Sequence, residues 1–76
     1  MKRSIDTQIR AQTARVDAAR RRESLSTQRY ESGVDSYLSV LLAQQELYAS
    51  QQALIQARLA KLSNLTALYA ALGGGG

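Results

Sequence analysis

The 76-residue sequence predicts an all-α fold: an antiparallel two-helix coiled-coil hairpin with arms at about residues 3–32 and 36–72. The chain contains no proline, and Gly33 is the only glycine before the terminal run, so one break separates two helix-favouring segments. In both segments apolar residues recur every seven residues, which is the spacing of a coiled-coil seam. We therefore expect one unit, residues 1–72, with a tip turn at 32–36.

The first arm is rich in alanine, arginine and glutamine, which favour helix, but its large apolar residues are sparse. Ile9, Val16 and Tyr30 share a seven-residue register in which Glu23 is the polar exception. The adjoining row consists of Ile5, Gln12, Ala19 and Ser26. A seam this thin predicts that the arm depends on a partner helix.

The turn between the arms is predicted at Gly33, Val34, Asp35 and Ser36. Glycine accepts the left-handed backbone conformation that ends many helices. Asp35 or Ser36 can then cap the first turn of the second arm with a side-chain oxygen.

The second arm has more apolar surface than one antiparallel neighbour requires. One row recurs every seven residues: Leu41, Tyr48, Ile55, Leu62 and Tyr69. A second row lies beside it, made of Val40, Leu47, Leu54 and Leu68, and further leucines widen the surface: Leu38, Leu59, Leu65 and Leu72. A stripe this wide predicts two or more helical neighbours, and hence hairpins that pack side by side. The predicted association residues are Leu41, Tyr48, Ile55, Leu62, Leu65, Leu68, Tyr69 and Leu72.

The position of the turn also predicts the alignment of the two arms. With the turn near Gly33 and Val34, residue i of the first arm lies opposite about residue 67 minus i. Ile5 then faces Leu62, and the apolar residues beyond it extend past the start of the first arm. Exposed apolar surface of this kind indicates a partner. The terminal glycines, residues 73–76, are predicted to form a flexible tail.

The composition argues against an enzyme. The chain has no cysteine and no histidine, so the commonest general base and the commonest metal ligand are both absent. No catalytic, metal-binding or cofactor-binding residue is predicted, and Asp35 and Glu46 lie too far apart along the helix to form a catalytic pair. No apolar run approaches the roughly 20 residues of a membrane span, and no apolar core follows the basic start. As written, the chain is expected to be soluble and without a targeting signal.

The net charge of +4 comes entirely from the first arm, since residues 1–32 hold eight Lys/Arg against four Asp/Glu. The triplet Arg20, Arg21 and Arg22 could bind phosphate groups, because clustered arginines gain from counterion release. Three consecutive residues point in different directions around a helix, however, which favours a solvated face. No nucleic-acid motif or interleaved aromatic residue accompanies them. A basic helical nucleic-acid binder is therefore only a minor alternative, and no nucleic-acid partner is predicted.

Two segments, roughly residues 28–75, carry a family resemblance: RYESGVDSYLSVLLAQQELYASQQALIQARLAKLSNLTALY and the closing ALGGG. They resemble the TolC/OprM-type outer-membrane efflux proteins, and the Ala/Arg/Gln-rich arm before them does so more loosely. They match the second periplasmic helical hairpin of that family. In the family, homotrimers build a long periplasmic α-barrel from such hairpins, continued by a β-barrel in the outer membrane, and the duct exports drugs, metals or proteins. The resemblance therefore implies a structural and interaction element of an efflux duct, whose parent protein lies in the outer membrane and periplasm. It also implies that such hairpins pack laterally into an α-barrel-like or tubular homo-oligomer.

The resemblance also implies partners for the tip. In this family the hairpin tips dock onto a periplasmic adaptor protein, which connects the duct to an inner-membrane pump. Residues 33–36 would form the adaptor-facing turn, and Tyr30 would belong to the network that holds the duct end closed. The family usually has an aspartate before Ala-Gln, where this chain has Leu42, and Ser39 stands where another such acid can occur. An acidic, cation-binding gate is therefore not expected.

A single hairpin that starts with methionine suggests an excised or engineered part of such a protein. Separated from a barrel, it could self-assemble into bundles, tubes or filaments, which is the alternative function. Repeated heterologous contacts close into rings or run into helices, depending on the rotation per contact.

Overall fold

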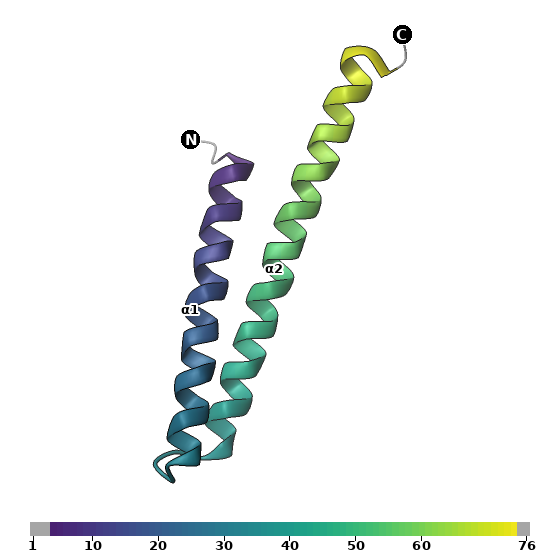
Figure 1. The fold of residues 1–76 in the computed structure, drawn as a ribbon. Coiled ribbons are helices and arrows are strands. Elements are labelled where there is room, and N and C mark those ends of the chain that lie inside the picture. The colour runs from purple at the N-terminus through teal and green to yellow at the C-terminus, as the bar shows by residue number, and fades with distance from the viewer. Residues whose placement is uncertain (1–3, 75–76) are drawn as a thin grey trace.

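The computed structural model describes residues 4–74, which form an antiparallel helical hairpin (Figure 1). Helix α1 spans Ile5–Glu31, helix α2 spans Tyr37–Tyr69, and a short π-helical segment, η1, follows at Ala70–Gly74. The radius of gyration is 18.2 Å, well above the about 11 Å of a compact domain of this length. The structure confirms the predicted all-α two-helix hairpin, while its packing into a larger assembly remains a prediction.

Local capping explains where the helices begin and end. Helix α1 begins at Ile5 because Ser4 Oγ accepts a hydrogen bond from the Thr7 backbone N–H at 3.1 Å. The predicted start at residue 3 lies outside the described residues. At the other end, η1 continues the helical backbone to Gly74, so the first two glycines of the predicted tail lie in a helical segment. Glycine allows this because it has no strong conformational preference. Residues 75 and 76 are not among those described.

The contact between the helices combines small side chains with larger apolar ones. The residues buried between the helices are Val16 and Ala19 in α1, and Val40, Ala43, Ser50 and Leu54 in α2. Ala19 is only 1% exposed and Ser50 is fully buried, and facing small residues let large neighbours interdigitate. The Ser50 hydroxyl donates a hydrogen bond to the Leu47 carbonyl at 2.7 Å, which satisfies it within its own helix.

Only one of the two apolar rows of α2 faces α1. Val40 and Leu54 are 3% and 8% exposed, so we call their row the inner seam. Leu41 and Tyr48 are 43% and 64% exposed, and we call their row the outer row. The outer row comprises Leu41, Tyr48, Ile55, Leu62 and Tyr69. The hairpin contact therefore leaves a complete apolar row on the surface.

Two ion pairs at different heights show how the helices are aligned. Lys61 Nζ lies 2.8 Å from Asp6 Oδ1, and Arg22 Nη2 contacts Glu46 Oε1. The residue numbers of these pairs sum to 67 and 68, in agreement with the predicted alignment. Helix α1 therefore begins near the level of Leu62, and α2 extends past it (Figure 1). The exposed apolar residues on this extension are Leu65, Leu68, Tyr69 and Leu72.

Candidate interaction surfaces

The turn at the tip has the hydrogen bonds of a Schellman motif. The Val34 N–H donates to the Arg29 carbonyl at 2.9 Å, and the Gly33 N–H donates to the Tyr30 carbonyl at 3.0 Å. Gly33 has a φ of +76°, which is the left-handed conformation that this motif requires after the C-cap Ser32. The structure thus places Gly33 where the sequence predicted a helix-ending glycine.

Asp35 holds the start of α2 through three hydrogen bonds. Its Oδ1 accepts from the Ser39 hydroxyl and from the Ser36 backbone N–H, both at 2.8 Å, and its Oδ2 accepts from Arg29 Nε at 3.4 Å. Of the two predicted capping residues, Asp35 makes these bonds, whereas the Ser36 side chain makes no capping bond. The hydrogen bond from Ser39, followed by that from Ser36, lowers the pKa of the Asp35 carboxyl because both favour its charged form.

We expect acid to destabilise the hairpin partly through Asp35. Because its pKa is lowered in the folded state, the stabilisation is present above the ordinary value of 3.8 and is lost as the pH falls through the lowered value. The urea midpoint of the wild type should therefore drop at pH values below 3.8, and Asp35→Asn should drop less over the same range. Lys61 also lowers the pKa of the Asp6 carboxyl, so Asp6 contributes a second loss of stability in acid. Asp6→Asn is therefore the matched comparison. If the urea midpoint of Asp35→Asn fell with pH as steeply as that of the wild type, this carboxylate would not hold the turn.

The tip presents aromatic and apolar side chains to solvent. The Tyr30 and Tyr37 rings, one from each helix, have centroids 5.1 Å apart and planes tilted by 58°, which is a favourable aromatic contact. Val34, at the turn itself, is 66% exposed. The sequence analysis missed Tyr37 and Arg29 as tip residues. The alignment could have found Tyr37, because Tyr30 and Tyr37 lie at equal distances from the centre of the turn.

All eight residues predicted for lateral association lie on the surface. Their exposed fractions range from 43% at Leu41 to 77% at Leu72. Leu68 lies in the same seven-residue row as the inner seam, and it is exposed because α2 extends past the start of α1 at this height. A run of exposed apolar side chains along one helix is typical of a protein–protein contact.

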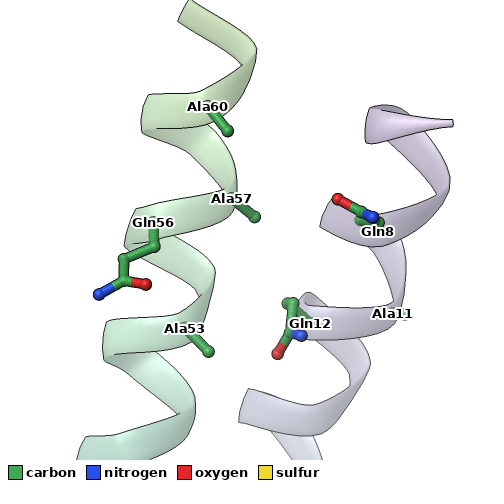
Figure 2. Close-up of a pocket in the computed structure, with 7 residues that line it drawn as sticks. All are labelled: Gln8, Ala11, Gln12, Ala53, Gln56, Ala57 and Ala60. Carbon is green, nitrogen blue, oxygen red and sulfur yellow. The ribbon is translucent and has the colours of Figure 1, made fainter. Parts of the chain in front are cut away.

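A shallow groove of about 470 Å³ lies where the two helices diverge toward the start of α1. Figure 2 shows its lining residues: Gln8, Ala11 and Gln12 from α1, and Ala53, Gln56, Ala57 and Ala60 from α2. Gln12 Oε1 is buried there and has no hydrogen-bond partner among the described residues. Ala53 and Ile55 stand on either side of Leu54 in the inner seam, so this groove and the outer row lie on opposite sides of the hairpin contact.

The arginine triplet does not form one patch. Arg22 pairs with Glu46, whereas Arg20 lines a separate depression together with Arg58. This arrangement agrees with the interpretation of the triplet as a solvated face. Within residues 4–74, no three His, Cys, Asp or Glu side chains gather as a metal site would require. Neither helix in that range contains an apolar stretch suited to crossing a bilayer.

Comparison with known proteins gives consistent matches over almost the whole chain. A family model described as outer membrane efflux protein matches residues 3–74. The solvent efflux pump outer membrane protein SrpC of Pseudomonas putida is 50% identical over 68 residues, which cover 90% of this chain and 14% of that protein. The pyoverdine export outer membrane protein OpmQ of Pseudomonas aeruginosa is 44% identical over 71 residues, 93% of this chain and 15% of the relative. The antibiotic efflux pump outer membrane protein ArpC of Pseudomonas putida is 42% identical over 74 residues, with 97% and 15% covered.

No solved structure matches the chain. The chain spans 14–15% of the length of these curated relatives. Efflux proteins are transporters, so the matches agree with the prediction that the chain is not an enzyme. Because the family model covers almost all of the chain and the relatives are 42–50% identical to it, this helical hairpin belongs to the outer membrane efflux protein family.

Proposed function

We propose that the hairpin is a structural element of the periplasmic α-barrel of an efflux duct, whose parent protein lies in the outer membrane. The exposed outer row carries this proposal. The inner seam already accounts for the contact with α1, so the second apolar row contributes nothing to the folding of a single hairpin. A hairpin in the wall of a barrel has a neighbour on each side and needs both rows. The named relatives act in solvent, pyoverdine and antibiotic efflux, and we propose export of small organic molecules for the parent.

The tip residues Gly33, Val34, Asp35 and Ser36 are proposed to contact a periplasmic adaptor protein, which would link the duct to an inner-membrane pump. The exposed Val34 supplies an apolar contact. The Schellman bonds and the Asp35 cap hold this turn in one conformation, so little conformational entropy is lost on binding. Tyr30, in contact with Tyr37, is proposed to take part in closing the end of the duct.

The isolated chain has a second candidate function, self-assembly into bundles, tubes or filaments. The observation that favours it is again the outer row, which in the isolated chain can be covered only by other copies. Both candidates use the same lateral surface and differ in whether it contacts neighbouring hairpins of a duct or other copies of this chain.

Leu62→Glu should weaken lateral association without affecting the tip. Leu62 is 60% exposed in the hairpin, and burying a leucine stabilises a contact by about 1.5–3 kcal/mol. Its replacement should therefore weaken association by about tenfold or more, measured by sedimentation across concentration. Gln56→Glu adds the same charge to α2 on the side of the groove, away from the outer row, and should have a smaller effect. An unchanged mass for Leu62→Glu would contradict the assignment of the outer row.

The same set of variants tests the tip separately. Val34→Asp places a charge at the exposed tip residue and should abolish binding to a purified periplasmic adaptor protein in a surface-binding assay, while leaving the mass of the assembly unchanged. Leu62→Glu should retain adaptor binding per hairpin. If Val34→Asp binds as the wild type does, the adaptor does not dock on this turn.

A further inference from the structure

We propose that the depression lined by Arg20 and Arg58 binds a small organic anion, one that carries a carboxylate or sulfonate group on an apolar body. The depression has a volume of about 320 Å³, at the lower end of the range for small-molecule sites. Its lining residues come from both helices. One of them is Ile55 of the outer row, so the depression and the groove of Figure 2 lie on opposite sides of the hairpin contact.

The two arginines approach the depression from opposite ends. The alignment set by the ion pairs places Arg20 level with about Leu47, so the Cα atoms of Arg20 and Arg58 stand about 16 Å apart along the hairpin. A helical side chain leans toward the N-terminus of its own helix. Arg20 therefore leans toward Val16. Arg58 leans toward Leu54, and because the helices are antiparallel, the two arginine side chains lean toward each other.

The charges of these two arginines are left without a partner in the hairpin. Neither Arg20 nor Arg58 belongs to an ion pair formed within residues 4–74. The acids nearest to Arg20 along α1 are Asp17 and Glu23, and neither lines the depression. Asp6, within three residues of the level of Arg58, already takes part in an ion pair between the helices. An anion in the depression therefore gains charge-assisted hydrogen bonds from two guanidinium groups.

The floor of the depression is apolar. Val16 and Leu54 are buried between the helices, and the half-exposed Ile55 forms an edge. The amide of Gln51 also lines the depression and offers further N–H donors. An anion held by the arginines thus has apolar surface beside it, on which a ring or a short alkyl chain can pack. This combination favours an amphiphilic organic anion over an inorganic ion or a nucleic-acid phosphate, because neither of these has an apolar part to place there.

This site does not depend on the lateral association proposed above. Ile55 belongs to the outer row, so a neighbouring hairpin would contact the edge of the depression. In a chain that does not associate, the depression simply stays open. A failure of lateral association would therefore leave this inference intact.

Two fluorescent probes of similar shape test the site. Anilinonaphthalene sulfonate carries a sulfonate on an aromatic body, and phenylnaphthylamine is the same body without the sulfonate. The double variant, Arg20→Gln with Arg58→Gln, should bind the sulfonate about tenfold more weakly than the wild type, and each single variant about threefold more weakly. The neutral probe should bind the wild type and the variants equally. Both probes are titrated at a protein concentration at which sedimentation gives all the proteins the same mass.

Arg21→Gln is the matched control. It removes the same charge from the next position of α1, which points about 100° away around the helix, so its affinity for the sulfonate should remain that of the wild type. Circular dichroism checks that each variant is helical. An equal loss in Arg21→Gln and Arg20→Gln would show that only the net charge matters, and would overturn the site. Unchanged sulfonate binding by the double variant, or an equal loss for the neutral probe, would overturn it as well.

Discussion

Replacing Leu54 with alanine should unfold a large part of the isolated hairpin. Leu54 is 8% exposed and packs in the inner seam, where removal of a buried leucine side chain costs about 2–5 kcal/mol. A hairpin of this size buries little surface and has a small free energy of unfolding, so this loss is large relative to the total. The expected result is a marked fall in helical circular dichroism and in the urea midpoint, both measured at a concentration low enough to disfavour association.

Leu59→Ala is the matched control for this prediction. It removes the same atoms from the same helix, but Leu59 is 58% exposed, so the change in the free energy of unfolding should stay within about 0.5 kcal/mol. A loss as large as that of Leu54→Ala would mean that the inner seam has been assigned to the wrong row of α2.

Gly33→Pro should open the tip and separate the two arms. Proline fixes φ near −65°, whereas Gly33 has a φ of +76°, and proline lacks the N–H that donates to the Tyr30 carbonyl. The expected cost is about 3 kcal/mol or more, comparable with proline inside a helix. Urea unfolding followed by circular dichroism measures this loss.

Two further substitutions at Gly33 distinguish the effect of backbone conformation from that of a steric clash. A Cβ added at Gly33 would meet nothing within 4 Å, so no steric clash is expected. Gly33→Ala should cost about 1–2 kcal/mol because alanine disfavours the left-handed conformation, and Gly33→Asn should cost less because asparagine tolerates it. If proline were as well tolerated as asparagine, the turn would not depend on the left-handed conformation of Gly33.

The sequence predicted the hairpin well because its decisive features are local. The single internal glycine marked the turn, and the position of that turn set the alignment that the Asp6–Lys61 pair agrees with. The turn chemistry was only partly predictable. Asp35 and Ser36 are both good capping residues, and the choice of Asp35 depends on bonds from Ser39 and Arg29 that form only once the turn is folded.

The spacing of the large apolar residues in α2 does not predict which of their rows is the inner seam and which the outer row. Both rows repeat every seven residues, so periodicity alone does not say which of them faces α1. The structure resolves this through small residues that the sequence analysis did not name, Ala43 and Ser50, which lie opposite α1 and are buried. The seven-residue spacing of these small residues, matched by Ala19 and Ser26 on α1, is the sequence signal that would have identified the inner seam.

The interaction surfaces were predictable in outline for a similar reason. Exposed apolar residues and an exposed tip follow from composition and from the turn, and the residues of the lateral surface are indeed on the outside of the hairpin. What covers them depends on a second molecule, whose surface neither the sequence nor the single hairpin contains.

The most direct test of lateral association is the mass of the purified chain in solution across concentration, by sedimentation equilibrium. One chain has a mass of 8.3 kDa. The outer row predicts that the mass rises with concentration to multiples of this value, toward closed rings or extended filaments. A mass of 8.3 kDa at every concentration, with the helices intact by circular dichroism, would contradict it.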